Sequence, residues 1–320
     1  MSEEIKDTAM QQDENLDFTH VGVDLHEGEA IGGKATSFMK DAMRRFSHNK
    51  VAMICLVFLV LIILGAIFFP MVSKYDYAEQ DVANNYLGMF STTSDGNFHL
   101  FGTDVLGRDL WTRVWTGARV SLIIAFAAVI INFLVGAVYG GISGYCGGLT
   151  DNIMMRIVDL ITGIPYMIIV MLLMMVMDPG IGTIIIAYST VGWTGMARLV
   201  RGQVVQLKEQ EFVMASKVMG ASPFRILARH LIPNTLSVVV VNLTLSIPNA
   251  IFTEAFLSYI GLGIAPPQAS WGSLANDGAA MMTIYPYLMF VPAIFISITM
   301  LSFNLVGDAL RDAFDPKQRK

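Results

Sequence analysis

A chain of 320 residues in which 54% are hydrophobic and only 15% charged, with a mean hydropathy of +0.57, lies far outside the range of soluble domains and belongs to the membrane class. The net charge of −5 is unevenly spread, because ten of the 26 acidic residues stand in the first 41 positions. The apolar remainder is close to balanced, so the charge gives no support to nucleic-acid binding.

Residues 1–48 are predicted to form a partly disordered tail. Met1–Phe46 is hydrophilic, with no apolar run behind a positively charged start, so no cleavable signal peptide is expected and the first apolar span has to direct the chain to the membrane. Ser2–Glu29 has few aromatic or β-branched residues, which is typical of disorder.

Six apolar stretches are candidates for spanning helices, which need about 20 apolar residues. They are Val51–Ser73, Ala118–Tyr139, Ile153–Met177, Ile181–Val200, Thr235–Phe256 and Ile284–Val306. They predict an all-α polytopic membrane protein. After the tail, the predicted parts are a first transmembrane helix at 49–73, an extracytoplasmic loop at 74–117, a core of five helices at 118–310 and a second tail at 311–320.

Lys and Arg residues set the predicted orientation, because they concentrate on the cytoplasmic side of membrane proteins. They gather before the first span, between the fourth and fifth, and after the sixth, whereas residues 178–180 and 257–283 have none. Both termini and the loop 201–234 are therefore expected in the cytoplasm. Cys55 and Cys146 would lie near that side, where thiols stay reduced, and no disulfide is expected.

Small residues and prolines predict how the spans pack and bend. Gly136, Gly140 and Gly144 repeat at four-residue spacing on the second span, which favours a close helix-packing face over a binding site. Kinks are expected at the prolines of the fifth and sixth spans, Pro248, Pro286 and Pro292.

The loop before the fifth span predicts two short helices. Lys208–Met219 forms the first, Gly220 suits the position just past its end, and Ser222 can cap a second helix that starts at Pro223 and ends at Pro233. The apolar face of the second helix comprises Phe224, Leu227, Ala228 and Leu231. Periodicity leaves two interpretations open: a helix lying on lipid headgroups, or an element that docks into a groove of a cytoplasmic partner.

The stretch EFVMASKVMGASPFRILARHLIPN resembles the cytoplasmic signature loop of ABC importer permeases, in the version carried by the oligopeptide, dipeptide and nickel subfamily. Ala215, Gly220 and Pro233 match the general motif, and Glu211 and His230 match the subfamily form. LFGTDVLGRDLWTRVWTGARVSL, RIVDLITGIPYMI and FTEAFLSYIGLGIAPPQASWG resemble further signatures of the subfamily in the right order. The chain is most similar to its C-type permease subunit.

This resemblance implies a type I ABC importer (MetI-like) fold in the cell membrane, with six transmembrane helices and both termini cytoplasmic. A second, similar permease would complete a heterodimer, two ATPase subunits would dock on the cytoplasmic loops, and an extracytoplasmic binding protein would deliver oligopeptides or dipeptides. No catalytic residue, cofactor or metal site is expected in this chain. It has no G-x-x-x-x-G-K-[ST] loop, so ATP and magnesium would be bound by the partners.

The resemblance also implies two groups of functional residues. The residues that would couple the chain to the ATPases are Glu211, Ala215, Gly220, Ala221, Ser222, Pro223, Arg225, Arg229, His230 and Pro233. The outer-loop signature comprises Gly102, Thr103, Asp104, Gly107, Arg108 and Asp109. Asp104 and Asp109 are too few and too scattered for a cage that holds a hard cation.

Ionisable residues inside spans are candidates for functional roles. Arg156 and Asp159, three apart on one helix face, are expected to pair, with a substrate role as the alternative. Glu254 near the outer end of the fifth span would meet a peptide amino group or a partner helix, or extend to the lipid headgroups.

Three other functions stay open: a proton-coupled secondary transporter, an ABC permease for nickel or another solute, and a membrane scaffold. The five His residues stand at 20, 26, 48, 99 and 230, outside every predicted span, which counts against a proton relay.

Overall fold

The computed structural model describes residues 38–314. The predictions for the two tails therefore lie mostly outside the described residues. The chain falls into two compact units, Met1–Asp41 and Ala42–Lys320, and the arrangement described here is that of the second. Its helices in chain order are α3 (Phe38–His48), α4 (Lys50–Val72), α5 (Leu110–Cys146), α6 (Gly148–Gly163), α7 (Tyr166–Val176), α8 (Ile181–Leu207), α9 (Glu211–Val218), α10 (Pro223–Ile226), α11 (Ile232–Tyr259), α12 (Trp271–Ala279) and α13 (Tyr287–Phe314).

All six expected spans coincide with helices, but they differ in how well they suit a membrane. Within residues 38–314, α4, α5, the continuous helix Pro223–Tyr259 and α13 are long and apolar enough to cross a bilayer, and α6 with α7 makes a fifth candidate if the bent pair is one span. The fourth expected span lies in α8, which is 27 residues long but is not among these helices. Gly, Ser, Thr and Arg198 lower its hydropathy.

The expected third span is broken. α6 and α7 meet at a bend of 78° across Ile164 and Pro165. A proline disfavours the helical conformation in the residue before it, and Ile164 is extended, with φ −91° and ψ 132°. The single continuous helix predicted for Ile153–Met177 is therefore wrong, because Pro165 divides it into two helices.

The outer segment is shorter than the predicted loop at 74–117, because α5 begins at Leu110 rather than at Ala118. Asp109 caps this helix, and its carboxylate accepts a hydrogen bond from the Thr112 N–H. Before it stand a 3₁₀ turn (Val82–Asn84) and two short antiparallel strands, β1 (Ser91–Thr92) and β2 (Phe98–His99).

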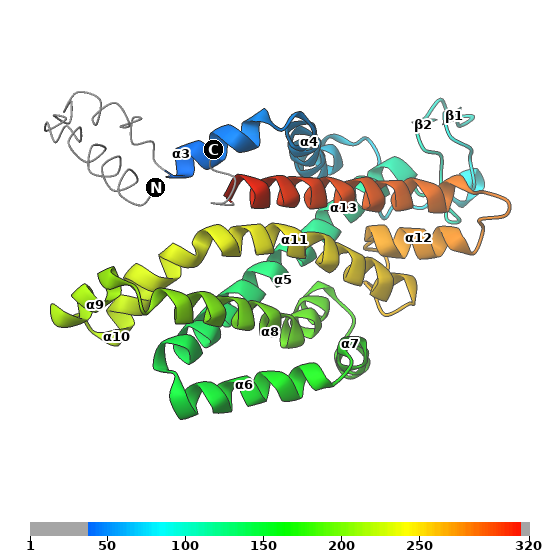
Figure 1. Cartoon of the computed structure of the whole chain (residues 1–320). Helices are drawn as coiled ribbons and strands as arrows, with labels where there is room; N and C mark the ends of the chain where they lie inside the picture. The colour runs from blue at the N-terminus through cyan, green and yellow to red at the C-terminus, as the bar shows by residue number, and fades with distance from the viewer. Residues whose placement is uncertain (1–37, 315–320) are drawn as a thin grey trace, which may run out of the picture. The chain divides into compact units, whose positions relative to one another are not determined.

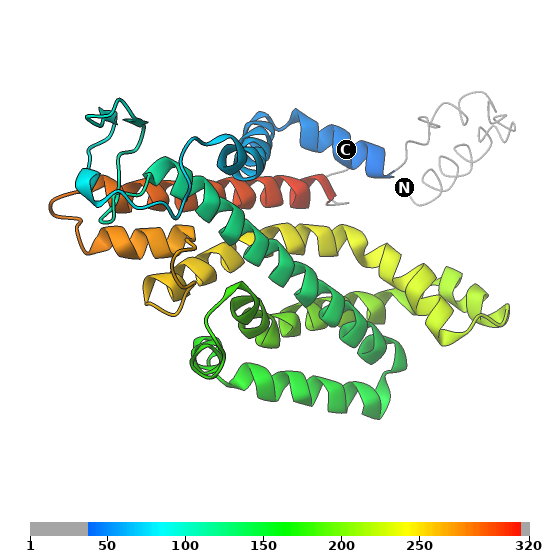
Figure 2. The ribbon, with the colours of Figure 1, turned by 180° about the vertical axis from the view of Figure 1, so that it is seen from behind.

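The glycine repeat of α5 packs against α8, which confirms the predicted packing face. A Cβ added to Gly140 would overlap the backbone of Ala197, one on Gly136 would overlap Met196, and one on Gly144 would crowd Val204. Figure 2 shows α5 crossing in front of both α8 and α11. The α5 and α8 backbones come close at these three positions because the glycines leave no side chain between them.

Arg119 of α5 donates hydrogen bonds to backbone carbonyl groups near the end of α4. Pro70 lies inside α4 and has no N–H, so it cannot bond the carbonyl group of Ala66, four residues earlier. The Arg119 guanidinium donates to the Ala66 and Ile67 oxygens at 2.9 and 2.7 Å. An arginine inside a predicted span is thus held by backbone acceptors of the neighbouring helix.

Prolines also lie inside the last two long helices, as predicted: Pro248 in α11 and Pro292 in α13. Pro286, in contrast, stands just before α13 begins. Between these helices, Ser270 and Ser273 form a reciprocal capping box that starts α12.

We expect Gly140→Leu to destabilise the chain by at least about 1–3 kcal/mol, because the added side chain must push α5 and α8 apart. The melting temperature of the purified protein in detergent measures the loss. Gly182→Leu is the matched control, since a Cβ on Gly182 meets no atom of another residue within 4 Å. Equal melting temperatures for the two variants would contradict close packing at Gly140.

Candidate functional site

The loop between α8 and α11 forms a helical hairpin, which we call the coupling segment (residues 208–233). Figures 1 and 2 place α9 and α10 together at the shared end of α8 and α11. Gly220 has φ +79° at the turn, and the Ser222 hydroxyl accepts from the Arg225 N–H, with Pro223 at the start of α10. The predicted cap and turn residues are confirmed.

The limits of the predicted helices need correction. α9 starts at Glu211 rather than Lys208, because α8 continues to Leu207. Pro233 does not end the second helix. A π-helical turn, Leu227–Leu231, joins α10 to α11, and Pro233 sits in the first turn of α11. The wider turn changes which carbonyl groups face the proline ring, so the helix runs on from Pro223 to Tyr259.

Buried side chains anchor the coupling segment on the long helices. Val213, Ile226 and Leu231 are completely buried, in one apolar cluster with residues of α5, α8 and α11. The Lys208 ammonium donates to the Gly144 carbonyl at 2.9 Å, and the Lys217 ammonium lies 5.7 Å from the centre of the Tyr145 ring. The coupling segment is therefore packed against all three of these long helices.

Four large apolar side chains of the coupling segment are exposed. The exposed fractions are 80% for Phe224, 88% for Val218, 79% for Met219 and 58% for Met214. Sequence periodicity placed Phe224 on the same face as Leu231, yet Leu231 is buried and Phe224 points outward. We call these four residues the exposed edge.

An ion pair that the sequence did not reveal lies next to the coupling segment. The Arg201 guanidinium donates to both oxygens of Asp151, at 2.6 and 2.5 Å, and the Ser143 hydroxyl donates to the same carboxylate. The three residues come from α5, α6 and α8. The only signal in the sequence was that Asp151 stands before the third expected span and Arg201 after the fourth. Because 50 residues separate them, the sequence could not predict that the two side chains meet.

Asp159 pairs with α8 rather than with its own helix. Its carboxylate accepts from Arg198 at 2.9 Å, and both side chains are about half exposed. The predicted pair between Arg156 and Asp159 is therefore wrong, since α8 presents a guanidinium closer than Arg156.

The outer-loop signature forms a network of hydrogen bonds and ion pairs, which we call the outer network. The Asp104 carboxylate accepts from the N–H groups of Leu106 and Arg108, and it pairs with Arg108 Nε at 2.7 Å and Arg113 Nε at 3.3 Å. The Thr103 hydroxyl donates to the Asn84 carbonyl at 2.6 Å. These are buried contacts that fix the backbone.

Two glycines and a histidine complete the outer network. Gly102 and Gly107 have φ +77° and +73°, and a Cβ on either would overlap a backbone carbonyl of the 81–88 stretch. Asp109, the α5 cap, lies 2.8 Å from His99 Nδ1. The signature residues therefore position the start of α5.

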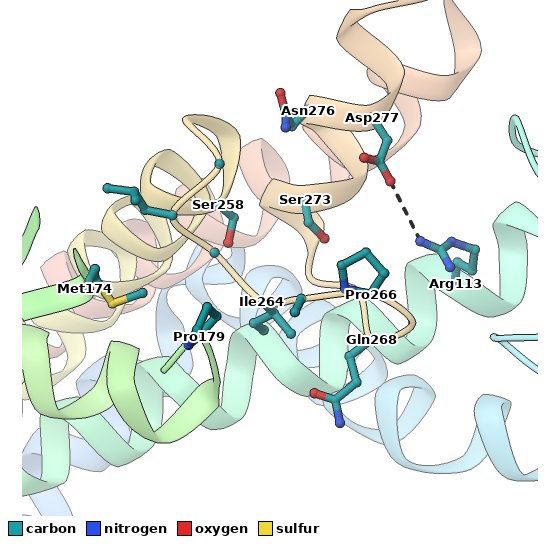
Figure 3. A pocket seen from close by; sticks show the side chains of 14 residues that line it. Arg113, Met174, Pro179, Ser258, Ile264, Pro266, Gln268, Ser273, Asn276 and Asp277 are labelled. Atoms are coloured by element: carbon teal, nitrogen blue, oxygen red, sulfur yellow. Dashed lines mark ion pairs between the residues drawn. The ribbon is translucent and has the colours of Figure 1, made fainter. Parts of the chain in front are cut away.

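A cavity of about 350 Å³ lies beside the outer network, between α5, α12 and the connection after α11. Figure 3 shows Arg113 and Asp277 pointing toward one another at one end, with 3.9 Å between their charged atoms. Burial raises the pKa of the Asp277 carboxyl, and the Arg113 charge opposes that rise. The cavity thus has a charged end and a mixed wall of apolar residues, glycines and uncharged polar side chains.

Glu254 is completely enclosed rather than extended to the lipid headgroups. It is 1% exposed, and its carboxylate oxygens accept hydrogen bonds from the Ser121 and Ser258 hydroxyls at 2.7 and 2.8 Å. The Trp271 N–H donates to Ser121, which links α5, α11 and α12 through this carboxylate. Of the two alternatives for Glu254, extension to the lipid headgroups is wrong, because three helices surround the residue.

Comparison with known proteins agrees with this architecture. Residues 136–320 match the family model described as binding-protein-dependent transport system inner membrane component. The chain belongs to this family, and it is a multi-pass subunit of an ABC importer in the membrane. Residues 37–88 also match the N-terminal TM domain of oligopeptide transport permease C.

Curated relatives resemble the chain over nearly its full length. It is 50% identical to the oligopeptide transport system permease protein OppC of Bacillus subtilis, over 95% of this chain and 97% of that protein. It is 47% identical to the dipeptide transport system permease protein DppC of the same organism, over 92% and 90%. An inward-facing structure of the MetNI methionine ABC transporter covers 62% of this chain and 94% of the matched chain, with 18% identity and a TM-score of 0.48.

We expect Asp104→Asn to destabilise the outer segment by about 3–5 kcal/mol, because Arg108 and Arg113 would stay buried without their shared carboxylate. Limited proteolysis of residues 74–109 and the melting temperature in detergent report the change. Asp95→Asn, in the exposed turn between β1 and β2, is the control. A stable Asp104→Asn variant would show that the buried charges are balanced without Asp104.

Proposed function

We propose that this chain is the C-type permease subunit of an ATP-driven importer of oligopeptides or dipeptides. It would form half of the translocation pathway with a second, similar permease. Two ATPase subunits would supply the energy, with ATP and magnesium bound there, and an extracytoplasmic peptide-binding protein would deliver the substrate. The exposed edge of the coupling segment is the observation that supports docking of the ATPases. The similarity to oligopeptide and dipeptide permeases supports a peptide as the substrate.

The exposed edge has the chemistry of a docking surface. Met214, Val218, Met219 and Phe224 are exposed on a helical hairpin that is anchored by the buried side chains of Val213, Ile226 and Leu231. Flexible methionines and an aromatic ring suit a groove in a protein partner. The adjoining Arg225 and Arg229 would meet acidic groups or lipid phosphates at the rim.

The anchoring of the coupling segment explains how a partner would drive transport. Because Val213, Ile226 and Leu231 are buried among α5, α8 and α11, a push on α9 and α10 moves these helices as a body. The basic residues of the loop 201–234 support a cytoplasmic position for the segment and both termini under the positive-inside rule.

The direct test is peptide uptake into proteoliposomes that contain the complete importer and its binding protein. We expect uptake of radiolabelled trialanine to require ATP inside the vesicle and to survive a protonophore. Uptake that collapses with the proton gradient and ignores ATP would establish a secondary transporter instead. Uptake of nickel without uptake of any peptide would leave an ABC permease with another substrate.

We expect Gly220→Val to lower ATP-dependent uptake roughly five- to thirtyfold, the factor that corresponds to 1–2 kcal/mol, because a β-branched residue at φ +79° costs about that much. The complex should still hydrolyse ATP, so the ratio of peptide moved to ATP consumed falls. Gly202→Val is the matched control, since both glycines have open space around a Cβ and only Gly220 has a positive φ. An unchanged ratio in Gly220→Val would overturn the coupling role.

A further inference from the structure

A small chamber lies between α5, α8 and α11, apart from both the coupling segment and the outer cavity. Its volume is about 180 Å³, and its polar lining includes Asn132 of α5 and Asn242 and Ser246 of α11. All three stand inside the second and fifth expected spans, away from their ends. Polar groups at such depth in a membrane protein are costly unless they have partners or a function.

Asn132 is the least satisfied of these groups. It is 7% exposed, and its Oδ1 has no hydrogen-bond partner among residues 38–314. Gly192 of α8 makes room for the amide, because a Cβ there would overlap Asn132 Nδ2. A buried amide oxygen without a donor costs about 1–3 kcal/mol. The fold thus maintains an unpaired acceptor at the wall of the chamber.

The lining chemistry limits what this acceptor can bind. The lining contains two amides, a serine hydroxyl and the Tyr188 ring, and none of its residues is charged. Amides and hydroxyls both donate and accept, as the peptide group does. An ammonium or a carboxylate would find no counter-charge here and would lose its hydration. The chamber therefore fits an uncharged polar backbone better than an ionic group.

The chamber is open and small. Gly195, one of its lining residues, is exposed, so the chamber reaches the surface of the chain. Pockets that enclose a whole ligand usually measure about 300–1,000 Å³. A volume of about 180 Å³ accommodates a part of a peptide at a time.

We propose that this chamber is a transit site in which Asn132, Asn242 and Ser246 hydrogen-bond the backbone of a passing peptide without recognising its side chains. The inference rests on the proposed function and names the part of the substrate that this chain contacts. It accounts for an unpaired amide oxygen inside an expected span and for a lining without charge. Side chains of either charge would stay outside the chamber.

The first experiment compares three labelled tripeptides in ATP-dependent uptake: trialanine, trilysine and triglutamate. We expect Asn132→Leu and Asn242→Leu each to lower kcat/KM about three- to tenfold, the value of one lost hydrogen bond, and by the same factor for all three peptides. Asn249→Leu is the matched control, because that amide lies exposed on α11. Melting temperatures are measured on every variant.

Each outcome separates the transit site from the proposed function. A wild-type complex that takes up none of the three peptides would overturn the proposed function. Wild-type uptake with unaffected Asn132→Leu and Asn242→Leu variants would overturn only the transit site, as would a loss confined to one peptide. If both variants lost uptake and also melted at a lower temperature than the wild type, the amides would be assigned to packing and the transit site would be overturned.

A second experiment does not depend on transport rates. In a Cys55→Ser, Cys146→Ser background, we expect Ser246→Cys to react with an uncharged, water-soluble thiol reagent, and trialanine with its binding protein and ATP to slow the reaction. Leu134→Cys is the control. Leu134 is 55% exposed on α5 and does not line the chamber, so its cysteine should show no peptide protection. An unreactive Ser246→Cys, or reaction at the same rate with trialanine, would overturn the proposal.

Discussion

The close contact between α5 and α8 supports nearly every other feature of this chain. Gly136, Gly140 and Gly144 bring the two backbones together, and the residues beside them build what lies around the contact. At one end, Asp151 bridges to Arg201 and the buried side chains of the coupling segment pack on the same two helices. Further along, Asn132 rests against Gly192 and lines the chamber. In lipid, where apolar side chains gain little by leaving the solvent, such close packing is a main source of helix association.

Features that depend on a few neighbouring residues could be predicted from the sequence. The apolar stretches marked the long helices, because the length needed to cross a bilayer is a property of the local chain. Gly220, Ser222 and Pro223 were placed correctly, since turn and cap conformations follow from the chemistry of each residue. The resemblance of several motifs in order identified the family, which the comparisons confirm.

Features that depend on distant partners could not be predicted. Glu254 meets Ser121 from 133 positions earlier, and no local pattern distinguishes that enclosure from exposure to headgroups. Asp159 pairs with Arg198, 39 positions later, rather than with Arg156, because α8 lies beside α6 in the fold. Pro233 looked like a helix end, yet the π turn before it and the packing of Leu231 let the helix continue. In each case tertiary contacts decided between local options that were close in energy.

The continuity of Pro223–Tyr259 makes this helix a lever arm. At 1.5 Å per residue its 37 residues extend about 55 Å. One end carries Phe224 at the exposed edge, and near the other end Glu254 is held by serines of α5 and α11. In the proposed importer the serine-bound carboxylate would be the fixed end of this helix, and a body fixed at one end swings most at the other. A displacement of Phe224 by the ATPases would then reach the Glu254 end of the helix as a smaller movement.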